Sequence, residues 1–225
     1  MALRAIVFDF DGVIANSEPL HFRGYRDVLA GEGIALTEPD YYAQYLGFDD
    51  VGAFQAIGRK HRADWTGVEI AALVARKAAR LEELERDVSV LFPGAADAIR
   101  RAAAALPIAV ASGARGEEIR RVLIQERLID CFTAIVAAED TPASKPAPDP
   151  YLRALALLAP ACPRLRAAEC VAIEDSRWGL ESARAAGLRT VAVTTTYAAD
   201  ELTADLVIPS LQAMDLDLLA RLCSE

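Results

Sequence analysis

Residues 6–21 read IVFDFDGVIANSEPLH, an apolar run that changes abruptly into two aspartates, Asp9 and Asp11, and a glycine. A short, continuous apolar run is typical of a strand that is buried on both faces of a parallel sheet. Asp-Gly beside apolar residues is also one of the strongest short hairpin signals. Whether the aspartates form a turn or a functional site therefore depends on the residues at the ends of the other strands.

The apolar runs of the chain alternate with helical patterns. We expect strands at residues 5–8, 108–111, 134–137, 170–173, 190–193 and 206–208. Helical patterns occupy residues 94–105, 115–127, 148–158, 178–186 and 211–222. Alternation of this kind predicts right-handed βαβ units and an α/β fold with a parallel sheet.

One long interval interrupts this alternation. Helical patterns occupy residues 18–29, 41–46, 51–59 and 68–86. The last of them repeats apolar residues at helical spacing from Ile70 to Leu84. The chain therefore leaves the sheet after its first strand and returns to it later. We expect a helical domain at residues 16–88, inserted into a core formed by residues 1–15 and 89–225.

Composition limits the classes of partner. The chain has 225 residues, 53% of them hydrophobic, so it can bury a sizeable core. Its formal net charge of −9 argues against nucleic acid as a partner, because nucleic acid requires a basic surface. The same charge repels anionic substrates, which must then be held by local cations or by a metal ion.

Cysteine usage and hydropathy bear on the compartment. The four cysteines show no CxxC spacing and the chain has two histidines, which disfavours a structural zinc site and is typical of a reducing compartment. No basic leader precedes a long apolar stretch, and the apolar residues 102–111 are too few to span a bilayer. We therefore expect a cytoplasmic protein without a membrane partner, whose oligomeric state stays open.

Candidate site residues follow four of the expected strands, three times directly at the strand end and once after a proline-rich loop. They are Asp9 and Asp11, Ser112 and Gly113, Lys145 in a proline-rich loop, and Glu174 and Asp175. In an open α/β sheet the ligand crevice lies beyond the carboxyl ends of the strands. We therefore expect these residues to converge on one edge of the sheet.

Four of these residues carry oxygens that suit Mg²⁺, which prefers carboxylates together with water and phosphate. Asp9 and Asp175 can supply carboxylates from neighbouring strands, and the carbonyl of Asp11 and the carboxylate of Glu174 can complete the set. Mg²⁺ is therefore the expected cofactor.

The remaining residues suit a phosphoryl group. The Ser112 hydroxyl and the Gly113 backbone N–H can donate to phosphoryl oxygens, and Lys145 offers a positive charge. Of the two aspartates after the first strand, one can attack phosphorus while the other transfers protons. The expected partner is a small phosphorylated metabolite.

Each motif alone has a plainer explanation. Asp-Gly can be a turn, Ser112 part of an ordinary loop, and Lys145 part of a solvated loop. Glu174 and Asp175 can mark a helix start, with Ser176 as its N-cap. All four motifs in this order, each after its own buried strand, favour a single phosphate-and-magnesium site.

The stretches DFDGVIANSEPLH, VASGA, KPAPDPY and VAIEDSRWGLESARAAGL resemble the four motifs of the haloacid dehalogenase superfamily. The segment NSEPLHF is similar to the branch that holds β-phosphoglucomutases, phosphoglycolate phosphatases and related sugar-phosphate phosphatases. The resemblance implies a Rossmann-like three-layer core with a helical cap inserted after the first motif.

The same resemblance implies roles for the site residues. Asp9 would be the nucleophile that forms an aspartyl-phosphate, and Asp11 would protonate the leaving oxygen and then activate water, or a second hydroxyl in a mutase. Ser112 and Lys145 would bind the phosphoryl group. The Mg²⁺ ion would be held by Asp9, Asp11 and Asp175, with Glu174 nearby.

His21, Lys77 and Arg115 stand where the β-phosphoglucomutase-like pattern has residues near the substrate or a distal phosphate. From its pattern, His21 is equally compatible with a plain surface or buried histidine, whereas the pattern around Lys77 favours a solvated helix face. The mutase pattern carries an arginine for a second phosphate where residues 48–50 read Phe-Asp-Asp. The acidic residues there disfavour a mutase.

Three functions are compatible with these observations. The favoured one is a Mg²⁺-dependent phosphatase that acts on a sugar phosphate or a phosphoglycolate-like acid through an aspartyl-phosphate. A β-phosphoglucomutase-like sugar phosphomutase is the alternative. A receiver-like signalling module also uses an aspartate, a hydroxyl and a lysine around Mg²⁺, but it is shorter and has no insertion after its first strand, so it ranks last.

Overall fold

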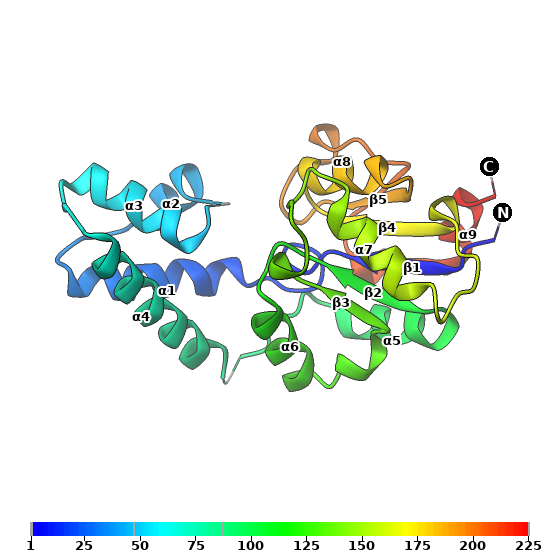
Figure 1. Ribbon diagram of the computed structural model, residues 1–225, viewed down its shortest axis with the longest axis horizontal. Coiled ribbons are helices and arrows are strands. Elements are labelled where there is room, and N and C mark those ends of the chain that lie inside the picture. Colours follow the sequence, from blue (N-terminus) through cyan, green and yellow to red (C-terminus); the bar gives the residue numbers. More distant parts are fainter. Residues whose placement is uncertain (1, 47, 87, 225) are drawn as a thin grey trace. The chain divides into compact units, whose positions relative to one another are not determined.

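The structure is a computed structural model that describes residues 2–46, 48–86 and 88–224 (Figure 1). Met1, Gly47, Asp87 and Glu225, which fall within the expected domains, lie outside the described residues. The chain forms two compact units, one of Met1–Asn16 with Val90–Glu225 and one of Ser17–Ser89.

The larger unit contains a six-stranded sheet in which all pairs of neighbouring strands are parallel. The strands are β1 (Ala5–Phe8), β2 (Ile108–Ala111), β3 (Ala134–Val136), β4 (Cys170–Glu174), β5 (Arg189–Val193) and β6 (Leu206–Ile208). Their order across the sheet is β3-β2-β1-β4-β5-β6. The order reverses direction between β1 and β4, which is the position where open α/β sheets bind ligands.

The register of the central strands sets the position of the acidic residues. Phe8 pairs with Ile173, so Asp9 and Glu174 follow at the same level of the sheet. The Asp9 N–H also donates to the Ile173 carbonyl, at 2.9 Å. The side chains of β1, β2 and β4 are fully buried, as expected for strands covered on both faces.

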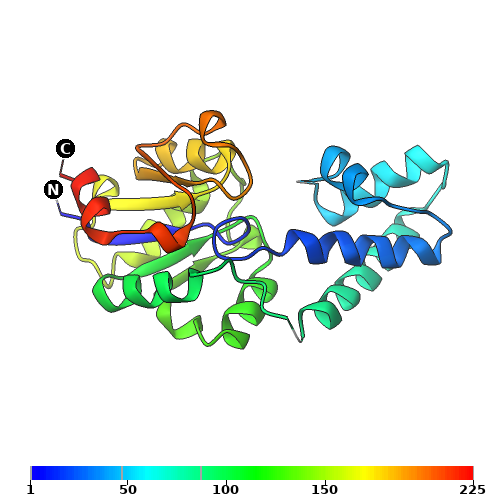
Figure 2. The same ribbon diagram turned by 180° about the vertical axis from the view of Figure 1, so that it is seen from behind.

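Helices cover both faces of this sheet. They are α5 (Ala95–Ala105), α6 (Gly116–Gln125), α7 (Asp149–Leu158), α8 (Arg177–Ala185) and α9 (Leu216–Leu222). Helix α7 lies in front of the sheet in Figure 1, and α5 and α9 lie in front of it in the reverse view of Figure 2. The three-layer α/β core predicted from the sequence is confirmed.

Short 3₁₀ helices complete the unit, and one of them corrects an expected helix. They are η1 (Ile129–Cys131), η2 (Ala138–Asp140), η3 (Ala167–Glu169), η4 (Ala199–Glu201) and η5 (Leu211–Ala213). The expectation of one helix over residues 211–222 is wrong, because η5 and α9 are separate. Met214 is extended, and the Asp215 side chain accepts hydrogen bonds from the N–H groups of Asp217 and Leu218, which starts a new helix.

The smaller unit is helical, as predicted for the insertion after the first strand. Its helices are α1 (Glu18–Gly31), α2 (Glu38–Gln44), α3 (Asp50–His61) and α4 (Gly67–Glu85). A capping box between Thr66 and Glu69 begins α4. Aromatic side chains, among them Tyr25, Tyr41 and Phe54, pack together in its core.

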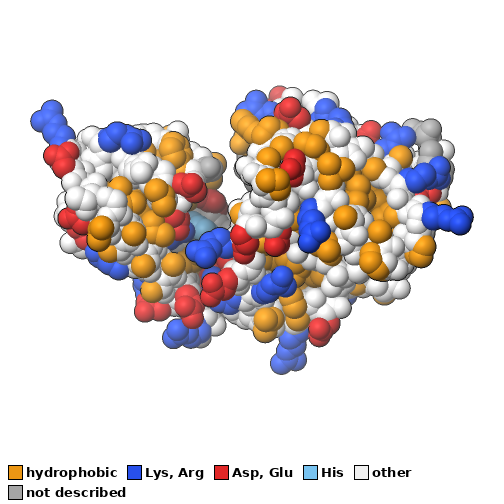
Figure 3. Space-filling view, viewed as in Figure 1, with side chains coloured by type: hydrophobic (Ala, Val, Ile, Leu, Met, Phe, Trp, Pro, Cys, Tyr) orange, Lys and Arg blue, Asp and Glu red, His pale blue; other side chains and the backbone are white. Residues whose placement is uncertain are grey.

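Acidic and basic side chains are interspersed on the visible face of each unit (Figure 3). The field around such a surface varies over short distances, so local groups decide where an anion binds. Among the described residues, no helix has both the length and the apolar character needed to cross a membrane.

Candidate active site

Three carboxylates gather beyond the carboxyl ends of β1 and β4. Asp9, Glu174 and Asp175 each offer one oxygen, and these oxygens all lie within 4.8 Å of one another. The three residues have exposed fractions of 8%, 0% and 6%. An all-oxygen donor set is what Mg²⁺ prefers, and a divalent cation would offset the repulsion among three buried carboxylates. The residues present therefore fit a divalent metal site.

Lys145 brings a positive charge to this cluster. Its Nζ lies 2.9 Å from Asp9 Oδ1 and 2.6 Å from Glu174 Oε1. Burial alone would lower the pKa of the Lys145 ammonium, but Asp9 and Glu174 outweigh burial and raise the pKa above its ordinary value. Lys145 therefore stays charged, and two carboxylates share it.

Tyr151 and Gly179, which lie in two of the quoted motif stretches but were not predicted as site residues, also position Glu174. The Tyr151 hydroxyl donates to Glu174 Oε1 at 2.5 Å, and Lys145 Nζ lies 5.5 Å from the centre of the Tyr151 ring. A Cβ on Gly179 would lie 2.0 Å from the Glu174 carboxyl carbon, so only glycine leaves room for this carboxylate. Burial and then the charge of Asp9 raise the pKa of Glu174 to about 8.

Asp175 lies beside the turn that follows β1. Burial and then the charge of Asp9 raise the pKa of Asp175 to about 6, and the Thr196 hydroxyl, which donates to Asp175 Oδ2, acts to lower it. Gly12 has a φ of 77°, which glycine adopts readily, and turns the chain away from the sheet. Asp11 lies in this same turn and is half-buried.

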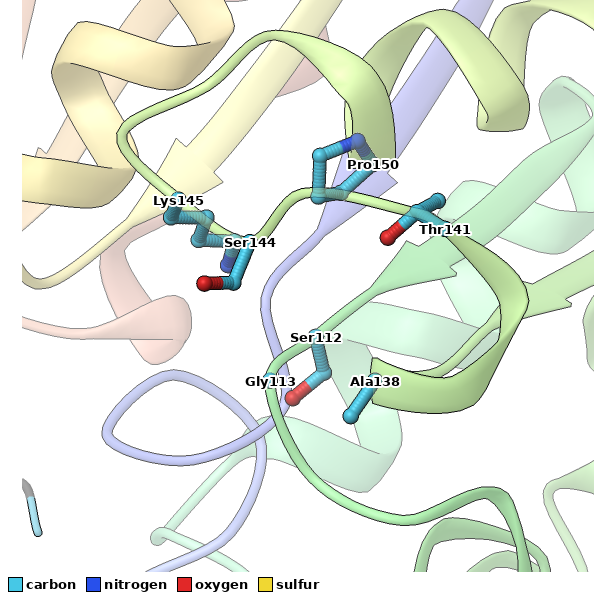
Figure 4. Close-up of a pocket in the computed structure, with 7 residues that line it drawn as sticks. All are labelled: Ser112, Gly113, Ala138, Thr141, Ser144, Lys145 and Pro150. Atoms are coloured by element: carbon cyan, nitrogen blue, oxygen red, sulfur yellow. The ribbon is translucent and has the colours of Figure 1, made fainter. Parts of the chain in front are cut away.

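A small pocket of about 140 Å³ adjoins Lys145. It is lined by Ser112, Gly113, Ala138, Thr141, Ser144, Lys145 and Pro150 (Figure 4). Lys145 and Ser144 lie on one side of the space and Ser112 and Gly113 on the other. The structure thus brings the three expected phosphate-binding residues together and adds Ser144 and Thr141, which the sequence patterns did not indicate.

His21 and Lys77 belong to the helical unit and contact each other. Lys77 Nζ lies 2.8 Å from His21 Nδ1 and 2.8 Å from Asp50 Oδ1. Lys77 is 2% exposed, so the favoured interpretation of this residue as part of a solvated helix face is wrong. The physical reason is its spacing, because Lys77 lies one helical turn from both Leu73 and Leu81 on the buried stripe of α4.

Arg115, the third candidate for substrate contact, belongs to the larger unit. It occupies the N-cap position of α6, and its side chain makes no capping hydrogen bond there. The residue is exposed and lies outside the set that lines the pocket. Its role stays a prediction.

Asp50→Asn should destabilise the helical unit more than Lys77→Met. The Tyr25 hydroxyl also donates to Asp50 Oδ1, at 2.6 Å, so Asp50 connects two partners. The Lys77 side chain is 2% exposed and cannot rehydrate when it loses the Asp50 carboxylate, whereas the Asp50 side chain is 30% exposed and can rehydrate when it loses Lys77. We expect a loss of about 2–3 kcal/mol for Asp50→Asn and less than about 1 kcal/mol for Lys77→Met.

Urea unfolding measures both losses through the fluorescence of Trp65, in a Trp178→Phe background where it is the only tryptophan. Burial would raise the pKa of Asp50, but Lys77 outweighs burial and lowers it. A lowered pKa stabilises the fold above the unfolded value, and this contribution disappears as the pH falls below about 4. Lowering the pH should therefore reduce the stability of the wild type more than it reduces the stability of the Asp50→Asn variant. Equal losses of stability for Asp50→Asn and Lys77→Met at pH 7 would contradict the argument.

The larger unit has a parallel sheet with aspartates, a lysine and an acidic pair at its switch point, and the helical unit is inserted after its first strand, which is the domain organisation expected for a haloacid dehalogenase-like phosphotransferase. The family model for haloacid dehalogenase-like hydrolases matches residues 6–193. The chain belongs to this family and is an enzyme of this hydrolase type.

Relatives share nearly the whole length of the chain. Protein CbbY of Rhodobacter capsulatus is 34% identical over 226 residues, which cover 95% of this chain and 96% of that protein. Hexitol phosphatase B of Escherichia coli is 32% identical and covers 84% of this chain and 82% of its own length. The crystal structure of a CbbY mutant from Rhodobacter sphaeroides in complex with xylulose-(1,5)bisphosphate is 27% identical, with a TM-score of 0.78 and coverage of 95% and 96%.

Proposed function

We propose that this protein is a Mg²⁺-dependent phosphatase that acts on a small phosphorylated metabolite through an aspartyl-phosphate on Asp9. The observation that carries the proposal is the position of Lys145. Its ammonium lies 2.9 Å from Asp9 Oδ1 and also lines the pocket formed with Ser112 and Gly113. A nucleophile, a cation and phosphoryl donors therefore meet at one sheet edge, as phosphoryl transfer requires.

Asp9 attacks through Oδ2. The Asp9 carboxylate accepts a hydrogen bond from the Phe10 N–H at 2.7 Å and lies 2.9 Å from Lys145 Nζ, and both contacts fall on Oδ1. Oδ2 forms a bond to phosphorus while the bond between phosphorus and the ester oxygen breaks. The departing oxygen takes a proton from Asp11, which yields the product alcohol and the aspartyl-phosphate.

Hydrolysis of the aspartyl-phosphate restores the enzyme. Asp11, now ionised, takes a proton from water, and the water oxygen bonds to phosphorus as the bond to Asp9 breaks. Phosphate leaves, Asp9 is again a carboxylate, and Asp11 again holds a proton. Lys145, the Ser112 hydroxyl and the Gly113 N–H stabilise the phosphoryl oxygens in both steps.

Asp9, Asp175 and the carbonyl of Asp11 would hold Mg²⁺, with Glu174 beside them. When bound, the ion neutralises charge on the phosphoryl oxygens. The buried carboxylates of Asp9, Glu174 and Asp175 support this assignment, because their oxygens lie within 4.8 Å of one another. Glu174 also holds Lys145, so it connects the metal site to the phosphate site.

We propose sugar or sugar-alcohol phosphates as the first substrates to test, with phosphoglycolate-like acids as the second group. One relative is a hexitol phosphatase, and another was crystallised with xylulose-(1,5)bisphosphate. Within the helical unit, Asp50 pairs with Lys77 and offsets its charge, which leaves less attraction for a second phosphate. This pairing supports hydrolysis over a mutase reaction that needs a bisphosphate.

The test is phosphate release from a panel of hexose, pentose and hexitol phosphates and phosphoglycolate, with Mg²⁺ and with a chelator. A bisphosphate-primed assay for conversion of a sugar 1-phosphate to the 6-phosphate runs beside it. We expect Mg²⁺-dependent release of phosphate from at least one ester and no isomerisation. If no ester is hydrolysed, the proposal fails, and isomerisation without net release would establish the mutase instead.

Gly113→Ala should harm substrate binding without harming the fold. A Cβ at Gly113 would meet no atom within 4 Å, so the protein itself has room for it. The phosphoryl group would have to share that room, and we expect KM to rise by about tenfold while the Tm stays unchanged. Steady-state kinetics and thermal unfolding measure the two effects, and a lowered Tm would show that Gly113 has a structural role instead.

A further inference from the structure

We propose that Thr196 is a positioning residue that orients the Asp175 carboxylate for the divalent cation, a role that rests on the metal-dependent function proposed above. Thr196 follows β5 and belongs to none of the four motifs. Its hydroxyl donates a hydrogen bond to Asp175 Oδ2. The terminal torsion of an aspartate is broad, so holding one carboxylate oxygen also determines where the other one points.

Asp175 Oδ2 is held from two directions. The Thr196 hydroxyl contacts it on one side, and the backbone of Gly12 lies on another. A Cβ on Gly12 would lie 2.0 Å from this oxygen and 3.0 Å from Thr196 Oγ1. The segments that follow β1, β4 and β5 therefore meet at one carboxylate oxygen, and the other oxygen, Oδ1, is assigned to the cation.

Thr196 is exposed, but the two residues before it attach its loop to the rest of the unit. The Thr195 hydroxyl donates to the Gly12 carbonyl, and the Thr194 N–H donates to the Ile208 carbonyl at 3.2 Å. The loop is therefore attached to the turn after β1 and to β6. A hydroxyl presented from such a loop is preorganised, and hydrogen-bonding partners of this kind tune the affinity of a metal site.

The test compares three variants of the full chain. Thr196→Val keeps the shape of threonine but removes the donor, and Thr196→Ser keeps the donor. Thr194→Val is the matched control, because among the described residues the hydrogen bonding of Thr194 involves only its backbone. Mg²⁺ binding is measured by isothermal titration calorimetry and by the rise in Tm with Mg²⁺ concentration.

We expect Thr196→Val to weaken Mg²⁺ binding by about 10- to 100-fold, and Thr196→Ser and Thr194→Val to stay within about threefold of the wild type. High Mg²⁺ should then restore the kcat of Thr196→Val, because mass action offsets weaker binding. A merely structural defect would not respond to Mg²⁺ in this way.

Two results would overturn the inference and leave the phosphatase function standing. One is an unchanged Mg²⁺ affinity in Thr196→Val. The other is an equal loss in Thr196→Val and Thr196→Ser, because the hydroxyl would then not be responsible. Wild-type protein that binds no Mg²⁺ would instead overturn the metal-dependent function itself, and this inference with it.

Discussion

Asp9→Asn is expected to abolish phosphate release, with a fall in kcat of about 10⁴-fold or more. The amide has nearly the shape of the carboxylate, and its oxygen can still accept from the Phe10 N–H, which donates to Asp9 at 2.7 Å. The amide lacks the negatively charged oxygen whose lone pair forms the bond to phosphorus. Phosphate release at saturating Mg²⁺ and substrate measures the effect.

The same substitution should not cost stability in the metal-free protein. The charge of Asp9 is one of the causes that raise the pKa of Glu174 and of Asp175, so its removal relieves repulsion within the buried cluster. Lys145 keeps Glu174 as a partner, at 2.6 Å. A Tm at or above that of the wild type, together with lost turnover, would separate chemistry from unfolding. Full activity of Asp9→Asn would rule out the mechanism.

The sheet could be predicted because its signals are local. Residues 5–8, 108–111 and 206–208 match β1, β2 and β6 without a shift, since an apolar run between polar residues marks a buried strand. Any parallel sheet places the carboxyl ends of its strands along one edge, so the sequence predicts that Asp9 and Glu174 lie on the same edge. Their close approach depends on β1 and β4 being neighbours, which the strand order of the structure provides.

The parts that escaped prediction depend on contacts between segments that are distant in the sequence. Thr196 and Tyr151 look like ordinary loop and helix residues until Asp175 and Glu174 are placed against them. Lys77 is different, because its spacing from Leu73 was visible in the sequence. The positive charge of Lys77 suggested a solvated position, but the side chain is buried because it pairs with Asp50.

Gly179→Ala is the second substitution for which we expect a large effect. It should destabilise the protein, whereas glycine-to-alanine substitutions in helices usually stabilise. Alanine inside a helix is ordinarily more stable than glycine, by about 0.5–1 kcal/mol. At this position a Cβ would lie 2.0 to 2.1 Å from the Glu174 carboxyl atoms. Glu174 must then move, although it holds Lys145 at 2.6 Å and Tyr151 at 2.5 Å.

We therefore expect Gly179→Ala to lose about 1–3 kcal/mol of stability through overpacking and to lower kcat/KM by about 100-fold through displacement of Lys145. Thermal unfolding and phosphate release measure the two losses. Gly67→Ala is the matched control, because Gly67 is also helical and a Cβ there would meet no atom within 4 Å. It should be neutral or slightly stabilising.

A double substitution tests the cause. If the clash with Glu174 is responsible, Gly179→Ala should cost much less stability in a Glu174→Ala background than in the wild type, because the two residues are in contact and their effects do not add. Activity should stay low in the double variant, since Glu174 no longer holds Lys145. Equal stability losses in the two backgrounds would mean that Gly179 acts through something other than the space it leaves for this carboxylate.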